Sequence, residues 1–243
     1  QFQAAAYAMQ PAIHLLPLRL RLVRPRPRVV VTYHDLRVPY LFPKAGRLRW
    51  WAVLALARWS DAVIATNAED EARLAAYPFI RRISRIPIGS NIAPAPPAGY
   101  DRMAWRARWG IGPDDILLAY FGFLNESKGG ETLIRALARL EGNVRLLMVG
   151  GKVGSSDPTN LAYAERIEAL ITALGLTGRV LWTGYTPQAE VSANLLAADI
   201  GVLPYRDGVS LRRGSLMAIL AHGLPIVSTR YPSAKTYIPN QDE

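Results

Sequence analysis

Several residue types that often mark a functional site are absent from this chain or scarce in it. None of its 243 residues is a cysteine, which excludes disulfides and thiolate metal sites. The three histidines, His14, His34 and His222, stand at no spacing typical of metal ligands, and no Asp-x-Asp pair occurs, so we expect no bound metal. Arginines interrupt the longest apolar runs, and no run reaches the roughly 20 residues of a membrane-spanning helix.

Lysine is also scarce, although the chain is strongly basic. Its formal net charge is +10, and 25 of its 29 basic residues are arginines. Codon usage alone could produce such an excess, but it is also typical of proteins with an acidic partner: phosphate, nucleic acid or an anionic membrane surface. Residues 19–28 alternate arginines with apolar side chains and could touch phospholipid or RNA. An exposed loop leading into a strand is the simpler interpretation of this stretch.

The hydrophobic pattern predicts an α/β protein. Half of the residues are hydrophobic, which is enough for one large core or two smaller ones. Three short apolar runs, at residues 28–33, 61–66 and 85–89, are typical of buried parallel strands.

A proline-rich stretch then indicates a domain boundary. Residues 94–97 hold three prolines, a composition that suits neither a helix nor a central strand. We therefore predict a first domain of residues 1–93 and a second domain of residues 94–243, joined by a linker.

The second domain has the more regular pattern. Its apolar runs alternate with segments of helical character, and this alternation is typical of a doubly wound parallel sheet. The expected strands are residues 116–121, 144–149, 179–183, 200–203 and 225–228, and the expected helices are residues 131–140, 163–174, 189–197 and 210–221.

The turn after the first of these strands is a candidate phosphate site. Gly122 stands at the strand end, and a glycine there lets a ligand approach the backbone. Lys128 stands just before the next helix, where its ammonium group could meet a diphosphate. A surface loop with a solvated lysine is the plain alternative.

The segment around Asp207 is the strongest candidate. Asp207 and Gly208 follow the fourth expected strand, and Arg212 and Arg213 stand in the first turn of the last expected helix. The N–H groups of a helix N-terminus and the forked guanidinium group of arginine both bind phosphate oxygens. A capped helix with exposed arginines would explain the same residues without a ligand.

A histidine ends the first expected strand. His34 directly follows residues 28–33. A histidine in this position can act as a base or donate a hydrogen bond to a ligand. It can equally serve to hold a loop in place.

Four stretches of the second domain carry a family resemblance. They are YFG with KGG (residues 120–122 and 128–130), RLLMVGG (residues 145–151), VLWTGY with Pro187 (residues 180–185) and residues 198–229. Together they resemble the nucleotide-sugar-binding domain of group 1 glycosyltransferases, which are family 4 enzymes of the GT-B fold. The last stretch resembles the family signature: an acid, seven residues, a second acid and then Ala-x-Gly-x-Pro-Val/Ile-Val. In the first domain, Thr32-Tyr33-His34-Asp35 resembles the strand-end histidine of the family.

The resemblance implies a fold and an activity. The fold would be GT-B-like, with two Rossmann-like doubly wound parallel-sheet domains, the first of them incomplete. The reaction would be a retaining transfer of a hexose from a nucleoside-diphosphate sugar to a hydroxyl group of a glycan or lipid-linked acceptor, with no metal and no cofactor. Such an enzyme would serve cell-envelope polysaccharide biosynthesis in the cytoplasm. Residues 19–28 and 36–43 would be candidates for contact with the inner face of the membrane, and no nucleic-acid partner is expected.

The resemblance also implies roles for single residues. Lys128 would neutralise the leaving diphosphate, His34 would hydrogen-bond the donor sugar, and Asp207 would lie near the transferred sugar. Tyr185 would lie near the base, and the N–H groups after Gly208 would meet the phosphates. The catalytic set is then His34, Lys128 and Asp207, and the donor-binding set is Gly122, Phe123, Tyr185, Gly208, Val209, Ser210, Leu211, Arg212, Arg213 and Ser215.

Three positions depart from the family pattern. Phe123 stands where an arginine is common, Asp207 replaces the commoner glutamate, and Ser215 replaces the second acid, which would bind ribose. We hypothesise that Arg212 or Arg213 supplies the missing cation for the phosphates. The alternative is that the site has lost its activity.

The ends of the chain also differ from the family. The chain starts after the first strand and glycine-rich loop of the family and stops before its last helices, so we expect a fragment with little or no transferase activity of its own. Two other functions stay open. One is a GT-B-like protein that is no transferase, either a nucleotide-sugar epimerase or a silent binding subunit; the other is a basic nucleic-acid-binding protein.

Overall fold

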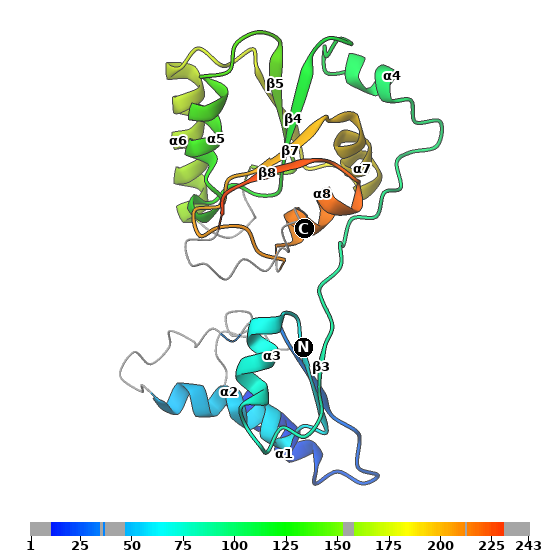
Figure 1. Ribbon diagram of the computed structural model, residues 1–243, viewed down its shortest axis with the longest axis vertical. Coiled ribbons are helices and arrows are strands. Elements are labelled where there is room, and N and C mark those ends of the chain that lie inside the picture. The colour runs from blue at the N-terminus through cyan, green and yellow to red at the C-terminus, as the bar shows by residue number, and fades with distance from the viewer. Residues whose placement is uncertain (1–10, 35, 37–46, 153–157, 212, 231–243) are drawn as a thin grey trace, which may run out of the picture. The chain divides into compact units, whose positions relative to one another are not determined.

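The chain folds into two compact units, Gln1–Ile88 and Gly89–Glu243 (Figure 1). The structure is a computed structural model that describes residues 11–34, 36, 47–152, 158–211 and 213–230. The sequence placed the boundary after residue 93, whereas Ile92 is already buried in the hydrophobic core of the second unit. None of the helices within the described ranges is long and apolar enough to cross a membrane.

The first unit is built on a small parallel sheet. Its strands lie in the order β1 (Val30–Tyr33), β2 (Ala62–Ala65) and β3 (Ile83–Arg85), and both neighbouring pairs run parallel. Its helices are α1 (Pro11–Leu20), α2 (Arg47–Trp59) and α3 (Ala68–Ala75). Tyr33 of β1, Leu54 of α2 and Leu74 of α3 are buried in one core with the sheet.

One strand of this unit differs from its prediction. The sequence indicated a strand at residues 85–89, but β3 already ends at Arg85. Pro87 lies within the predicted segment, and a proline has no N–H to give to a neighbouring strand. The ladder therefore stops before it.

The second unit holds a larger parallel sheet with helices on both faces. Its five strands all run parallel, and Figure 1 shows α5 and α6 on one side of them and α7 and α8 on the other. The strand order is β6 (Val180–Gly184), β5 (Val144–Val149), β4 (Ile116–Phe121), β7 (Ile200–Leu203) and β8 (Ile226–Ser228), and the helices are α4 (Arg102–Ala107), α5 (Gly130–Leu137), α6 (Pro158–Ala173), α7 (Gln188–Ala197) and α8 (Gly214–Ala221).

This arrangement confirms the predicted doubly wound parallel sheet. The strands expected at residues 116–121, 144–149 and 200–203 begin and end where β4, β5 and β7 do. Because the strands are parallel, their carboxyl ends lie at one edge of the sheet, which is where ligands of such folds bind. The candidate residues of the second unit belong to the segments that leave this edge, either in the loops or at the start of the helix that follows.

The short helix α4, which the sequence did not predict, is held to the sheet by the buried Arg106. Its guanidinium group donates to the carbonyl oxygen of Ala197 at 2.9 Å, to the carboxylate of Asp199 at 3.0 Å and to the carbonyl oxygen of Asp115 at 2.6 Å. Asp199 also accepts the N–H of Leu117 at 2.7 Å. Burial alone would raise the pKa of Asp199, but these donors outweigh it and hold the pKa below its ordinary value.

Candidate functional site

Two glycine loops run beside each other at the carboxyl edge of the second sheet. Gly122 follows β4 and Gly150 follows β5, with φ angles of 113° and 111°. The N–H of Gly122 donates to the carbonyl oxygen of Val149 at 3.0 Å. A Cβ atom at Gly150 would lie 3.8 Å from the backbone of Gly122. The loops approach this closely because neither carries a side chain at the point of contact.

Lys128 directs its ammonium group at the first of these loops. It ends a short 3-10 helix, η2 (Glu126–Lys128), which Asn125 begins by accepting the N–H of Lys128 at 3.1 Å. The Nζ atom lies 3.0 Å from where a Cβ of Gly122 would stand. Burial and, next, the positive charge of Arg213 lower the pKa of Lys128 to about 8. An anion bound here would offset both effects.

Gly129 joins the Lys128 turn to the loop that leaves β7. Its backbone is left-handed, with φ 71° and ψ 32°. A Cβ atom there would collide with the carbonyl oxygen of Pro204, the first residue after β7. The N–H of Arg206 reaches back to the carbonyl oxygen of Ser127 at 2.9 Å. The loops after β4 and β7 therefore pack as one structure, in which only glycine fits at position 129.

The loop between β7 and α8 contains an ion pair. Arg213 bonds both carboxylate oxygens of Asp207. Its guanidinium group also lies over the ring of Tyr205, 4.7 Å from the ring centre. A carboxylate and an aromatic face thus orient this cation. Arg212, the other arginine predicted to bind phosphate, lies outside the described residues.

The last helix begins later than the sequence predicted. A helix was expected over residues 210–221, but α8 starts at Gly214, with Arg213 in an extended conformation before it. The N–H of Arg213 donates to the carbonyl oxygen of Ser210 at 3.0 Å. This turn and the ion pair with Asp207 hold the stretch outside the helix, so the prediction of a helix N-terminus at Ser210 is wrong.

One of the N–H groups predicted to meet the phosphates, that of Val209, has a partner within the protein. The N–H of Gly208 donates to the carbonyl oxygen of Tyr205 at 3.2 Å, and that of Val209 donates to the carbonyl oxygen of Thr229 at 2.9 Å. The side chains of Val209 and Leu211 pack against the hydrophobic core. These contacts shape the loop, and the structure gives Val209 and Leu211 a packing role.

Two hydroxyl groups meet where the second acid of the signature was expected. The Oγ atom of Ser215 lies 2.7 Å from the hydroxyl oxygen of Tyr205. The Cβ atom of Ser215 lies 3.8 Å from the Cβ position of Gly122. Burial raises the pKa of Tyr205, so the phenol stays neutral. Tyr205 was not among the predicted residues; the signal that could have found it is an aromatic residue at a strand end, just before Arg206 and Asp207.

The second unit therefore gathers several predicted residues at one edge of its sheet. Lys128 and Ser215 both lie against Gly122, and Arg213, the cation of the ion pair with Asp207, lies close enough to Lys128 to contribute to its lowered pKa. Two cations, a bare stretch of backbone and two hydroxyl groups suit a phosphorylated ligand that carries further hydroxyl groups.

The chain matches two family models. The model described as glycosyl transferases group 1 matches residues 101–242, more than half of the chain, and the model described as glycosyltransferase family 4 matches residues 6–93. The chain belongs to the group 1 glycosyltransferases. The family predicted from the sequence is thereby confirmed.

Relatives and solved structures agree with this assignment. A D-inositol 3-phosphate glycosyltransferase of Xylanimonas cellulosilytica is 29% identical over 187 residues, which are 74% of this chain and 43% of that protein. The crystal structure of Anabaena Alr3699/HepE in complex with UDP and glucose has a TM-score of 0.68 at 21% identity and covers 90% of this chain and 57% of its own. Sucrose-phosphate synthase from Thermosynechococcus elongatus has a TM-score of 0.65 at 25% identity, with 93% and 57% covered. The GT-B-like fold is confirmed, and the chain spans about half the length of these proteins.

Two aromatic residues of the second unit are open to solvent at the same edge. Phe123 is 47% exposed, and Tyr185, which directly follows β6, is 89% exposed. The carbonyl oxygen of Phe123 accepts the hydroxyl group of Tyr120 at 3.3 Å. Exposed rings can stack on a flat ligand, which is the arrangement predicted for Tyr185 and the base.

His34 belongs to the first unit, where it follows β1. The half-buried residue accepts the hydroxyl group of Thr66 on its carbonyl oxygen at 3.3 Å. Its neighbour Asp35 lies outside the described residues. The contact of His34 with a donor sugar stays a prediction.

Proposed function

We propose that this glycosyltransferase binds a nucleoside-diphosphate sugar at the carboxyl edge of its second sheet. It transfers the hexose, with retention and without a metal, to a hydroxyl group of a glycan or lipid-linked acceptor. The observation that carries the proposal is the position of Lys128, a half-buried cation of lowered pKa beside the Gly122 turn.

In this proposal the protein stabilises the leaving group. When the bond between sugar and diphosphate breaks, negative charge builds on the diphosphate oxygens. Cations that are already held in place beside those oxygens lower the barrier, because they need not reorganise during the reaction. Lys128 is one such cation, and Arg213, oriented by Asp207 and Tyr205, is the second.

The remaining donor contacts follow from position and from the resemblance. Tyr185 stacks on the base, and the Tyr205–Ser215 hydroxyl pair takes the place of the missing acid at the ribose. Asp207 and His34 contact the transferred sugar. The support for the ribose contact is the 2.7 Å approach of the two hydroxyl oxygens beside Gly122.

The setting of the reaction is also a proposal. We infer that the enzyme works in the cytoplasm in cell-envelope polysaccharide synthesis and touches the inner face of the membrane through residues 19–28. The formal net charge of +10 supports contact with an anionic surface. Leu22, which is 80% exposed, supports it too.

Isothermal titration with nucleoside diphosphates and their sugars tests donor binding. UDP and UDP-glucose are the first probes, because the Anabaena structures contain them. We expect saturable binding of at least one nucleotide sugar and a loss of about tenfold or more in Lys128→Ala. Arg135→Ala removes a charge from the exposed face of α5 and serves as the control, with an expected change within about twofold.

Turnover separates a transferase from a silent binding subunit. Product formation from the bound nucleotide sugar, with the anomeric configuration read by NMR, supports retaining transfer. Binding without product on any glycan or lipid-linked acceptor supports the silent subunit, and interconversion of the free nucleotide sugar supports an epimerase. RNA binding with a steep salt dependence, and no nucleotide-sugar binding, would contradict the proposal.

A further inference from the structure

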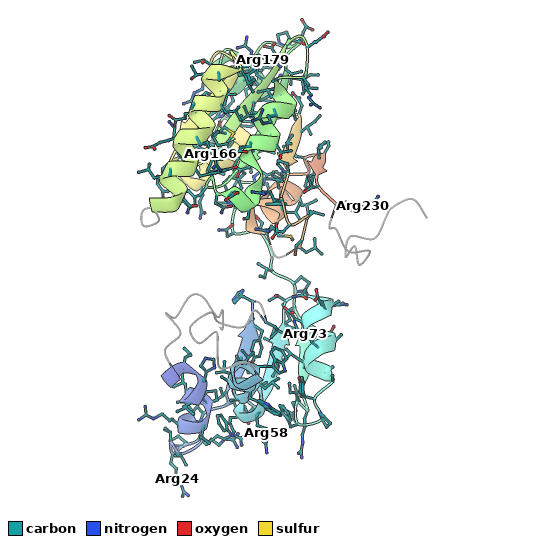
Figure 2. The ribbon with its side chains drawn as sticks, turned by 90° about the vertical axis from the view of Figure 1, so that its left-hand side faces the viewer. Arg24, Arg58, Arg73, Arg166, Arg179 and Arg230 are labelled. Atoms are coloured by element: carbon teal, nitrogen blue, oxygen red, sulfur yellow. The ribbon has the colours of Figure 1, made fainter. Side chains whose placement is uncertain are left out.

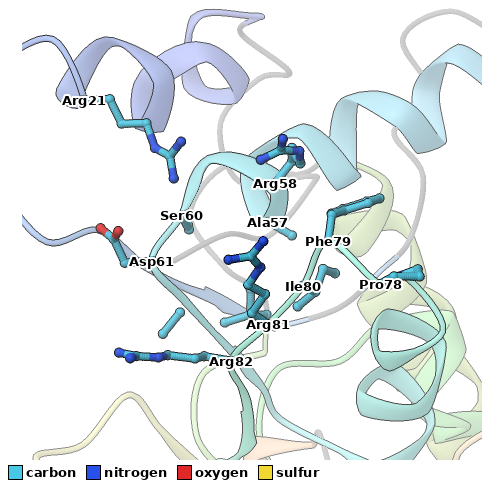
Figure 3. Close-up of a pocket in the computed structure, with 12 residues that line it drawn as sticks. Arg21, Ala57, Arg58, Ser60, Asp61, Pro78, Phe79, Ile80, Arg81 and Arg82 are labelled. Carbon is cyan, nitrogen blue, oxygen red and sulfur yellow. The ribbon is translucent and has the colours of Figure 1, made fainter.

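The first unit contains a second candidate site, a pocket of about 480 Å³. It lies where α2 ends and where β2 and β3 begin, and the segment of residues 78–82 forms one of its walls (Figure 3). His34 follows the carboxyl end of β1, and β1 runs parallel to β2. The pocket and His34 therefore belong to opposite edges of the same sheet.

Four arginines from three separate segments line this pocket. Arg21 follows α1, Arg58 stands in the last turn of α2, and Arg81 and Arg82 precede β3. In Figure 3 the guanidinium groups of Arg21, Arg58 and Arg81 extend into the same space. Arginines project from both units (Figure 2), but here the fold brings distant ones together around one pocket.

Asp61, an acid that lines the pocket, already has partners of its own. Asp61 pairs with Arg26 and accepts a backbone N–H at 2.9 Å. That backbone hydrogen bond and the neighbouring arginine hold the pKa of Asp61 below its ordinary value. Within the described part of the chain, no carboxylate forms an ion pair with Arg58, Arg81 or Arg82. The positive charge of the pocket is thus only partly balanced.

Arg21 is held in a position that suits a ligand. Its Nε atom donates to the carbonyl oxygen of Trp59 at 3.0 Å. This contact fixes the plane of the guanidinium group and uses neither of its two terminal nitrogens. A guanidinium group with one edge fixed can present its fork to two oxygens of a single anion.

We propose that this pocket binds a phosphate-bearing anion. Three or four guanidinium groups in one space repel each other, and a ligand with two or more negative charges removes that repulsion. Arginine forks bind phosphate oxygens in pairs. A pocket of about 480 Å³ has room for a phosphate or diphosphate group with part of its attached molecule.

The phosphate could come from a free compound or from an anionic lipid headgroup. Apolar side chains that lie exposed next to Arg21 in the chain support the lipid source. Leu22 is 80% exposed and Val23 is 48% exposed, and exposed apolar side chains beside arginines are typical of contact with a membrane surface. Both sources present the same group to the arginines, so the experiment must distinguish them.

The first arm uses inorganic pyrophosphate with the full 243-residue chain. Backbone amide signals of Ser60, Ala62 and Ile80 report on the pocket itself, separately from the Lys128 site, which would also take a diphosphate. We expect saturable shifts of these signals. The double variant Arg58→Gln/Arg81→Gln should weaken the binding about tenfold or more, since it removes two charged forks.

A matched control removes the same charge from the second unit. Arg135→Gln/Arg139→Gln changes two exposed arginines and should leave the affinity of the pocket within about twofold. Amide spectra away from the pocket check the fold of each variant. If the double variant unfolds, Arg81→Gln alone should still weaken binding about threefold or more, because Arg81 is exposed and its change disturbs little packing.

The second arm measures sedimentation with vesicles that contain phosphatidylglycerol and with vesicles of phosphatidylcholine alone. A lipid source predicts binding to the anionic vesicles that Arg58→Gln/Arg81→Gln weakens about tenfold or more and the control does not. If the ligand is a free phosphate compound, both double variants should bind the vesicles equally, while the pocket variant still binds pyrophosphate more weakly than the control variant does. The proposal is overturned if pyrophosphate does not shift the pocket signals and the pocket variant binds the anionic vesicles as tightly as the control variant does. It is also overturned if the control loses as much affinity as the pocket variant.

Discussion

A first side-chain carbon at Gly122 would stand 3.0 Å from the Nζ atom of Lys128. The ammonium group of Lys128 therefore points into the space that the absent side chain of Gly122 leaves open. The same glycine has a φ of 113°, a conformation that other residues adopt only with strain. Five expectations follow from this edge of the sheet and from the contacts that support it.

Gly122→Ala should weaken the binding of UDP-glucose by about tenfold or more, because a methyl group displaces the ammonium group and covers the backbone. Gly142→Ala is the control: Gly142 also has positive φ, 79°, but a Cβ there meets nothing within 4 Å. Both variants should lose roughly 1 kcal/mol of unfolding free energy through backbone strain. Equal donor affinity in the two variants, measured by calorimetry, would contradict the expected role of the space.

Lys128→Met should make the free protein more stable while it weakens donor binding by about tenfold or more. The wild-type protein at pH 7 keeps a charge on an amine whose pKa has fallen from 10.5 to about 8, and this costs roughly 1–3 kcal/mol of unfolding free energy. Urea unfolding at pH 7 measures the gain. Between pH 8 and 10.5 the unfolded chain binds the proton more tightly than the folded one, so wild-type stability rises with pH there and the gain shrinks. A gain that stays constant to pH 10.5 would show packing instead of charge as its origin.

The affinity for UDP-glucose should fall as the pH rises above about 8, by up to roughly tenfold per pH unit. The cause is the loss of the proton from Lys128, whose pKa is about 8 in the free protein. The diphosphate of UDP-glucose is a diester and has no proton to lose near this pH. Titrations from pH 6.5 to 9.5 should be flat below pH 7.5, and the residual binding of Lys128→Met should be flat throughout. If the affinity of the wild-type protein stays constant up to about pH 9.5, Lys128 does not contact the diphosphate.

Arg213→Gln should move this pH dependence upward, because the positive charge of Arg213 is one cause of the lowered pKa of Lys128. It should also weaken UDP-glucose binding at pH 7 by about tenfold, if Arg213 is the second phosphate cation. Arg206→Gln is the control, since the exposed Arg206 pairs with Glu126. Unchanged affinity in Arg213→Gln would refute the hypothesis that this arginine replaces the missing cation.

Asp199→Asn should lower the unfolding free energy by roughly 2–4 kcal/mol, because it leaves the buried Arg106 without its counter-charge. The pKa of Asp199 is held below its ordinary value, so its contribution is present above that ordinary value and disappears as the pH falls through the lowered one. Asp114→Asn, at an exposed position two residues before β4, should change stability by less than about 0.5 kcal/mol. Chemical unfolding at pH 7 and pH 3 compares the two.

The strands of the second sheet were predictable because strands that are buried on both faces consist of short runs of apolar residues. The stretches ILLAYF and VRLLMV begin and end with β4 and β5. The helix α4 was not predictable in this way. It has only six residues, and the contact that holds it is a buried Arg106 whose partners lie far along the chain. Contacts of that kind leave no local pattern.

Some residues of the candidate site could be predicted because the sequence shows a glycine or a charged residue close to the end of an expected strand. Gly122, Lys128 and Asp207 are of this type. The start of α8 was misplaced because residues 210–213 are compatible with a helix, and the ion pair of Arg213 with Asp207 holds them outside it. Tyr205 was missed because a tyrosine after a strand looks like core in a sequence, and only its approach to Ser215 distinguishes it.

The contacts of Arg106 set a limit on how this protein can be dissected. A recombinant piece that starts at Ile116 would contain all five strands of the larger sheet, yet the carbonyl oxygen of Ala197 and the carboxylate of Asp199 would lose the guanidinium group of Arg106. A piece that starts at or before Asp101 keeps α4, since the Asp101 side chain accepts the N–H of Ala104 at 2.7 Å. The autonomous folding unit is therefore longer than the sheet suggests. Because Ile92 is buried in its core, its natural cut lies before Ile92, near the boundary between Ile88 and Gly89.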